Sequence, residues 1–165
     1  MGPTLRPTTP IRGEAGPLVV AFGDFQCEAC LSFAATLEQA RAAGPSFKLA
    51  WKDLPLPSHP QAFSAAVAAR CAQRQGAFWR FHDALYASQA SLGDGSYGQI
   101  AAGLGLDGEQ FQTCLVDPSA AALVQSDVAE AAALGVDGTP YLFIGSRRFN
   151  RALTGDEFAA ALAGT

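Results

Sequence analysis

The sequence has no long apolar run, few charges and only two histidines. No uninterrupted apolar segment approaches the length of about 18 residues that a membrane-spanning helix needs. Only 16% of the residues are charged, and the net charge is −4. Lys and Arg are scattered rather than gathered in a basic stripe, so we expect no nucleic-acid partner. With 49% hydrophobic residues, the 165-residue chain can bury the core of one domain.

The chain is also too poor in cysteine for a disulfide-dense scaffold, and it is too long to need one. Its four cysteines are Cys27, Cys30, Cys71 and Cys114. The first two stand close together in "DFQCEAC", and the other two are isolated. This distribution indicates different roles for the two pairs.

The first 16 residues, "MGPTLRPTTPIRGEAG", lack the apolar core of a secretory signal. They are rich in Pro, Thr and Gly, and we predict that residues 1–16 form a flexible tail or linker. Two histories fit this segment. Either the protein is cytoplasmic, or a signal or anchor has been removed.

Apolar patterning predicts an α/β fold with one sheet. Residues 17–25 and 47–56 are predicted strands, separated by an Ala-rich helix that stops at Gly44. A strand–helix–strand unit of this kind should place its two strands in parallel. The middle of the chain is helical, residues 139–150 predict an antiparallel hairpin, and a last helix closes the chain. Strands at both ends predict a single sheet interrupted by a helical insertion.

Cys27 and Cys30 lie at the start of the first predicted helix, a position that alters the acidity of a thiol. The free N–H groups and the positive end of the helix dipole favour the Cys27 thiolate, the form that attacks disulfides. Cys30 lies one turn further on, on the same face. Two thiols at this spacing can pass between dithiol, disulfide and mixed disulfide. The preceding strand and following helix fit a thioredoxin-like C-x-x-C motif.

Other roles for the cysteine pair have weaker support. A closed zinc site needs four ligands, normally as two close pairs, and the histidines stand apart, so we expect no metal. A bare structural disulfide across so short a gap would restrain the unfolded chain little. We predict that His59 and His82 are surface or capping residues. The aromatic residues predicted in the core are Trp51, Phe78, Trp79 and Phe81.

Several motifs together resemble the DsbA-like branch of the thioredoxin superfamily. They are "VVAFGDFQCEAC", "WKDLPLPSHPQAFSAAVAARCAQRQGAFWRFHDALY", "FQTCL" and "GVDGTPYLFIGSRRF". The resemblance implies a thioredoxin fold with an inserted α-helical domain. We therefore expect a thioredoxin-like domain in residues 17–58 and 135–165, and an inserted helical domain in residues 59–134.

The resemblance also implies roles for site residues. Cys27 corresponds to the exposed nucleophile, and Cys30 to the thiol that resolves a mixed disulfide. The Thr139-Pro140 bond is expected to be cis and packed against the cysteine pair. The backbone of Thr139 would form a short edge on which a substrate segment docks. No organic cofactor or metal is required.

The dipeptide between the cysteines departs from the family pattern. Glu28-Ala29 stands where strong oxidants of the family carry Pro-His, and a carboxylate beside the sulfur disfavours its thiolate. We predict a higher Cys27 pKa and a less oxidising disulfide than in a Pro-His relative.

A second departure concerns the proton shuttle for the resolving thiol. Many thioredoxin-like proteins bury an acid six residues before the first cysteine, and that position is Ala21 here. Water, Asp24 or Lys52 would have to replace the acid, unless there is no shuttle. Asp24 can equally be a turn residue.

The remaining cysteines occur in contexts, "ARCA" and "TCL", that recur in relatives where the two can bond. We expect by resemblance a structural disulfide between Cys71 and Cys114, with two buried free cysteines as the alternative. Closing the loop between these two cysteines would contribute on the order of 4 kcal/mol to the free energy of unfolding. Such a bond would favour the cell envelope or a periplasm-like compartment over the cytoplasm.

We predict a thiol–disulfide oxidoreductase that exchanges its C-x-x-C disulfide with thiols of protein or peptide substrates, as an oxidase rather than a reductase. We expect a monomer that depends on a redox-recycling partner, either a membrane reoxidase or an electron donor. The alternatives are a non-catalytic peptide-binding module, a redox sensor, and a kappa-type glutathione transferase or isomerase. Members of that last group usually lack the second cysteine.

Overall fold

The computed structural model describes residues 1–165. These residues form a sheet, the helices that cover it, and a block of further helices. In chain order the elements are β1 (Ile11–Arg12), β2 (Leu18–Gly23), α1 (Glu28–Ala43), β3 (Lys48–Asp53), α2 (Ala62–Gln73), α3 (Phe78–Ala87), the 3-10 helix η1 (Gln89–Ser91), α4 (Asp94–Gly103), α5 (Gly108–Leu115), α6 (Pro118–Leu134), β4 (Tyr141–Ile144), β5 (Arg147–Phe149) and α7 (Gly155–Ala163). No helix combines the length and the hydropathy needed to cross a bilayer.

The five strands form one sheet in the order β1-β3-β2-β4-β5. The predicted parallel pairing of the first two long strands is confirmed, with Val20 of β2 opposite Ala50 of β3. β4 runs antiparallel to β2, and β5 completes the predicted hairpin. Every regular element between β3 and β4 is helical. The α/β class with a helical insertion is therefore confirmed.

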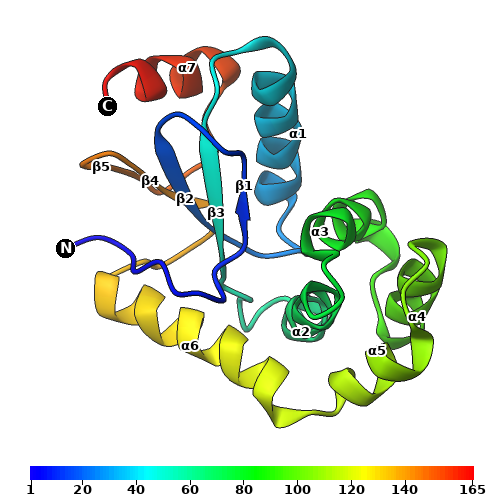
Figure 1. Cartoon of the computed structure of the whole chain (residues 1–165). Helices are drawn as coiled ribbons and strands as arrows, with labels where there is room; N and C mark the ends of the chain where they lie inside the picture. The colour runs from blue at the N-terminus through cyan, green and yellow to red at the C-terminus, as the bar shows by residue number, and fades with distance from the viewer.

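Helices cover both faces of the sheet because β2 is apolar on both faces. Val19 and Ala21 pack with α1 and α7, where the rings of Phe33 and Phe158 meet edge-on with centroids 5.9 Å apart. Val20 points the other way and packs with α6. Figure 1 shows α1 and α7 on one side of the sheet and α6 on the other.

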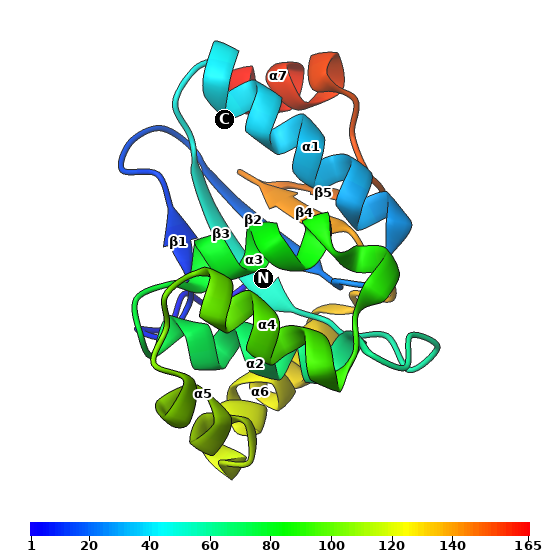
Figure 2. The ribbon, with the colours of Figure 1, turned by 90° about the vertical axis from the view of Figure 1, so that its right-hand side faces the viewer.

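The helices α2 to α5 form a block beside the sheet, separate from the α1 and α7 layer (Figures 1 and 2). The core of this block continues into Phe25, after β2, and Trp51 of β3, whose rings stack with centroids 5.1 Å apart. The predicted core positions Trp51, Phe78 and Phe81 are buried, and Trp79 is partly buried. Cys27 and Cys30 belong to the same cluster. The cysteine pair therefore lies where the sheet meets the helical block.

Residues 1–16 make more contacts than a flexible tail would. β1 pairs antiparallel with β3. Arg6 forms an ion pair with Asp127 of α6 at 2.8 Å, and the carbonyl of Thr8 accepts a hydrogen bond from Arg70 of α2. A two-residue strand has too little periodicity to be recognised in a sequence. Its partners also lie far along the chain, so local composition alone indicated a tail.

Candidate active site

Cys27 is held at the junction between β2 and α1. β2 ends at Gly23, where a Cβ atom would overlap the ring of Trp51, so the strand can pass this ring only as glycine. Cys27 has extended backbone angles and is the N-cap of α1. Its Sγ accepts a hydrogen bond from the N–H of Cys30 at 3.2 Å. The thiol thus occupies the place of a capping side chain and partners one of the free N–H groups of the helix.

The environment separates the pKa values of the two cysteines. The pKa of Cys27 falls from its usual 9.0 to about 6, chiefly through hydrogen bonding from Cys30. Burial and the charge of Asp24 oppose this shift. The pKa of Cys30 is raised, first by burial and then by Cys27. At neutral pH the pair therefore holds a thiolate at Cys27 and a thiol at Cys30.

The loop before β4 brings a backbone carbonyl to Cys27. The Thr139-Pro140 peptide bond is cis, as the resemblance implied. The carbonyl oxygen of Thr139 lies 3.5 Å from Cys27 Sγ, although the two residues are 112 positions apart. The Thr139 Oγ1 atom is buried and has no hydrogen-bond partner. The backbone at Thr139 therefore lies directly beside the reactive sulfur.

The dipeptide between the cysteines lies on the outside of the first turn of α1. Glu28 and Ala29 are both exposed, and Glu28 is the acidic residue of that first turn. A first-turn acid is favoured by the helix dipole. The carboxylate among the main causes acting on the Cys27 pKa is the buried Asp24.

Asp24 is a turn residue with additional partners. Its buried carboxylate accepts hydrogen bonds from the N–H groups of Gln26, at 2.7 Å, and Leu56, at 2.8 Å. Nδ1 of His59 lies 2.7 Å from the same carboxylate, so this contact links the loop after β3 to the loop that precedes Cys27.

No three His, Cys, Asp or Glu side chains are grouped closely enough to hold a metal ion.

Lys52, the other residue considered as a proton shuttle, lies in a network of buried charges. It is fully buried and pairs with Asp127, at 3.2 Å, and with Glu130, at 2.9 Å. Arg70 bridges Asp127 and Asp53, each at 2.6 Å. This network joins β3, α2 and α6.

A cavity of about 20 Å³ lies behind Cys30. Among the side chains that line it are Ala21, His82, Tyr86 and Pro140. Ala21 carries no polar group, so the only side-chain nitrogen base at the cavity is His82.

The prediction that His82 is a surface or capping residue is wrong. The residue is 6% exposed, and its ring lies edge-on to that of Trp51, with centroids 4.8 Å apart. A signal was present in the sequence. Position 82 follows Phe78 by four residues and precedes Leu85 by three, which places it on the apolar face of α3.

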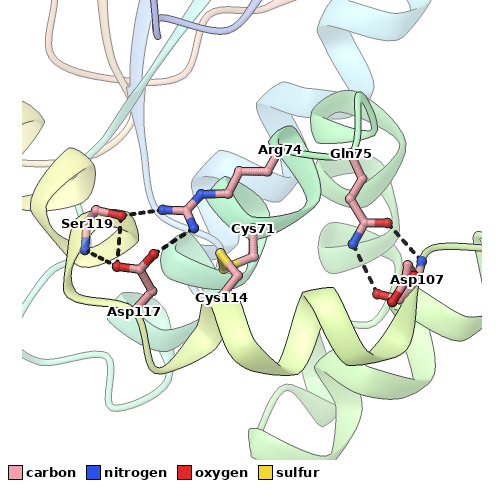
Figure 3. The surroundings of a disulfide bond; sticks show 7 residues. All are labelled: Cys71, Arg74, Gln75, Asp107, Cys114, Asp117 and Ser119. Carbon is pink, nitrogen blue, oxygen red and sulfur yellow. Dashed lines mark hydrogen bonds and ion pairs between the residues drawn. A yellow bond between two sulfur atoms is a disulfide. The ribbon is translucent and has the colours of Figure 1, made fainter.

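Cys71 of α2 and Cys114 of α5, which are 43 positions apart, form a disulfide. Figure 3 shows the disulfide with a polar contact on each side of it, one from Arg74 to Asp117 and one between Gln75 and Asp107. Both cysteines are buried, and Cys27 and Cys30 are free thiols. The disulfide therefore links two helices of the block and is separate from the C-x-x-C pair.

Comparison with known proteins places this geometry in a family. A family model described as Thioredoxin matches residues 6–163. A thioredoxin-like oxidoreductase from Silicibacter pomeroyi DSS-3 is 27% identical and has a TM-score of 0.84 over 96% of this chain and 92% of its own. The thiol-disulfide exchange protein alpha-DsbA2 from Wolbachia pipientis is 22% identical, with a TM-score of 0.85 over 96% of this chain and 87% of that one.

The curated relatives are longer proteins. The Na(+)/H(+) antiporter NhaA 3 of Salinispora tropica is 35% identical over 155 residues, covering 92% of this chain but 24% of the antiporter. NhaA 1 of Mycolicibacterium gilvum is 33% identical over 154 residues, covering 87% of this chain and 25% of the antiporter. The chain thus spans about a quarter of the length of the curated relatives that it matches. Because the family model extends over nearly the whole folded sequence, the chain belongs to the thioredoxin family and has the fold of its DsbA-like members.

Proposed function

We propose that the chain is a thiol–disulfide oxidoreductase that donates a Cys27–Cys30 disulfide to protein or peptide thiols. The observation that supports this best is the state of Cys27, an N-cap thiol with a pKa of about 6 beside the backbone of Thr139. A stabilised thiolate is a good leaving group. It also stabilises the dithiol form relative to the disulfide, which makes the disulfide an oxidant.

The proposed reaction has two exchange steps. A substrate thiolate attacks Cys27 Sγ of the oxidised protein, the bond to Cys30 breaks, and the Cys30 sulfur keeps the electron pair and takes a proton. A second substrate thiolate then attacks the substrate sulfur of the mixed disulfide, and Cys27 leaves as a thiolate. The substrate gains a disulfide, and the cysteine pair gains two electrons. Thr139 would position an extended substrate segment by backbone pairing.

The proposed setting follows from the chemistry. A single C-x-x-C pair cannot reoxidise itself after it has taken electrons from a substrate, so an oxidase needs a membrane reoxidase. A reductase would need an electron donor.

The Cys71–Cys114 disulfide supports an oxidising compartment such as the cell envelope. We propose that the domain works as a monomer. The ion exchange named for the curated relatives is not carried over, since the match covers only 24% of the first of them.

Two cysteine variants test the proposed exchange. With a reduced, unfolded protein whose activity depends on its disulfides, we expect Cys27→Ser to abolish catalysed refolding. In a buffer that contains glutathione disulfide as the oxidant, Cys30→Ser should instead accumulate a mixed disulfide between Cys27 and the substrate, visible as a higher-mass band that thiols remove. A peptide-binding module would retain its activity in Cys27→Ser. A redox sensor would react with peroxide and not with the protein thiols.

The reduction potential of the Cys27–Cys30 couple tests the direction. It is measured by equilibration in glutathione buffers, with Cys71 and Cys114 followed separately. A potential near about −120 mV, the range of DsbA, would support an oxidase. A potential near about −270 mV, the range of thioredoxin, would show that the exchange runs as a reductase.

A further inference from the structure

Cys30 has to gain or lose a proton in every redox cycle, yet it is 4% exposed. Burial and Cys27 raise the pKa of its thiol, so its proton needs a nearby base to leave at a useful rate. Ala21 lines the cavity behind Cys30 and offers no acceptor. Asp24 and Lys52 are hydrogen-bonded elsewhere, and neither lines this cavity.

His82 is the base that lines the cavity together with Cys30 and Tyr86. Its Nδ1 lies 2.9 Å from Oδ1 of Asp83. The pKa of Asp83 is lowered, although burial opposes this, because it is hydrogen-bonded to His82 and other partners. An ionised carboxylate can only accept a hydrogen bond, so Nδ1 carries the proton and Nε2 is left as an acceptor.

The cavity is lined mainly by apolar residues and has room for one water molecule. Its volume of about 20 Å³ exceeds the roughly 10–15 Å³ that one water needs. Cys30, His82 and Tyr86 are the lining residues whose side chains carry a thiol, an imidazole and a hydroxyl group. On the far side of His82, the side chain of Asp83 is 45% exposed and pairs with Arg12. A proton taken up at Nε2 can therefore leave from Nδ1 toward solvent.

We propose that His82 is the proton acceptor for Cys30, acting through one water molecule in this cavity. The inference rests on the proposed thiol–disulfide exchange. When a mixed disulfide is resolved, the water takes the Cys30 proton and gives one to Nε2 of His82. The Cys30 sulfur attacks Cys27 Sγ, a Cys27–Cys30 bond forms, and the bond from Cys27 to the outer sulfur breaks. The departing sulfur keeps the electron pair. In the opposite direction the same route returns a proton to Cys30.

A proton acceptor must be neutral at the working pH. Burial lowers the pKa of His82 below its usual 6.5, Asp83 on the same helix opposes this, Arg12 of β1 lowers it further, and Asp53 of β3 raises it. Two other titratable groups that line the same cavity are uncharged at neutral pH: Cys30 and Tyr86. His82 is therefore a neutral base at pH 7 and takes up a proton only at acid pH.

The test separates the attack by Cys27 from the resolution by Cys30. Reduced protein is mixed with dithio-bis-nitrobenzoate, and release of the coloured thiolate is followed by stopped flow. The first phase reports Cys27 attack, and the second reports displacement of the remaining nitrobenzoate thiolate by Cys30. For the wild type we expect the second phase to be flat near neutral pH and to slow as His82 is protonated at acid pH.

In His82→Gln we expect an unchanged first phase and a second phase roughly 100-fold slower at pH 7. Its rate should also rise with pH over the whole range, because hydroxide is then the only base. Arg80→Gln is the matched control. Arg80 is on α3 like His82, but it is exposed and does not line the cavity. This control should behave as the wild type in both phases.

A second variant covers the case in which His82→Gln fails to fold. Asp83 is largely at the surface, and its carboxylate raises the pKa of His82. Asp83→Asn should therefore move the acid limb of the second phase to lower pH. A wild-type second phase in His82→Gln, or an unmoved limb in Asp83→Asn, would overturn the proton route alone. A wild-type protein without a first phase would overturn the proposed function as well.

Discussion

At the scale of single residues, the reactivity of Cys27 depends on few neighbours. Hydrogen bonding from Cys30 lowers the Cys27 pKa, and burial and the charge of Asp24 raise it. The result, about 6, lies nearer to the value of about 7 for thioredoxin than to about 3.5 for DsbA. Glu28 is exposed, so a substitution there can change the pKa of Cys27 without disturbing the core.

Glu28→His should lower the pKa of Cys27 and make the disulfide more oxidising. The substitution replaces a negative side chain with one that can donate a hydrogen bond to the thiolate. Alkylation by iodoacetamide requires the thiolate, so its rate should rise with pH and reach half-maximum at about pH 6 in the wild type. We expect the variant's midpoint to fall by about one pH unit, which corresponds to a potential about 30 mV higher.

The control for this substitution is Glu109→His, which changes a first-turn acid of α5 far from the cysteine pair along the chain. Its alkylation midpoint should match that of the wild type. An unmoved midpoint in Glu28→His would show that the dipeptide does not set the pKa of the nucleophile.

How much of the site the sequence predicts depends on how local each signal is. Cys27 and Cys30 form a motif at one helix start, and "GVDGTP" resembles the family's cis-proline motif, so local motifs located the cysteine pair and the cis bond. The roles of these residues stay predictions. The partnership of His59 with Asp24 joins two loops 35 positions apart, which no pattern in one sequence reports. His82 is an intermediate case, because helical spacing placed it on the apolar face of α3 but not beside Cys30.

At the scale of elements, the first turn of α1 does two jobs. It begins the helix that follows β2 and covers one face of the sheet, and it supplies the Cys30 N–H that donates a hydrogen bond to Cys27 Sγ. The boundaries of the long elements follow from composition. Gly44 ends α1 as expected, and Pro118 and Gly135 bound α6. α4 forms although it contains several glycines, because packing of Tyr97 and Ala101 offsets the weak helix propensity of glycine.

Cys27→Ala should destabilise the fold more than Cys27→Ser does. Serine can accept the Cys30 N–H, whereas alanine leaves it without a cap, at about 1 kcal/mol. Urea unfolding of the two variants without reductant isolates the difference, because both leave Cys30 as a single free thiol. Thr154 caps α7 in the same way, so Thr154→Ala against Thr154→Ser is the matched comparison. Equal unfolding free energies for the two Cys27 variants would contradict the capping role.

At the scale of the whole molecule, buried charges hold the parts together. We propose that residues 17–58 with 135–165 and residues 59–134 form the two domains, and the chain crosses between them twice. Asp127 of α6 accepts hydrogen bonds from Lys52 and from the backbone N–H of Asp53 in β3. It also accepts from Arg70 of α2 and from Arg6 in the N-terminal segment. One carboxylate therefore joins the sheet, the helical block and the N-terminal segment.

Asp127→Asn should lower the free energy of unfolding by about 3–5 kcal/mol, because the buried cations Lys52 and Arg70 each lose one of their two carboxylate partners. Urea unfolding at pH 7 measures the loss. Asp117→Asn is the matched control, since Asp117 is at the surface, pairs with Arg74, and caps α6, a role that Asn fills as well as Asp. Its effect should be small. If the network couples the two proposed domains, Asp127→Asn should also split one unfolding transition into two, because the helical insertion then loses several of its polar links to the sheet. A single transition with wild-type stability would show instead that apolar packing around Phe25 and Trp51 is sufficient to hold the domains together.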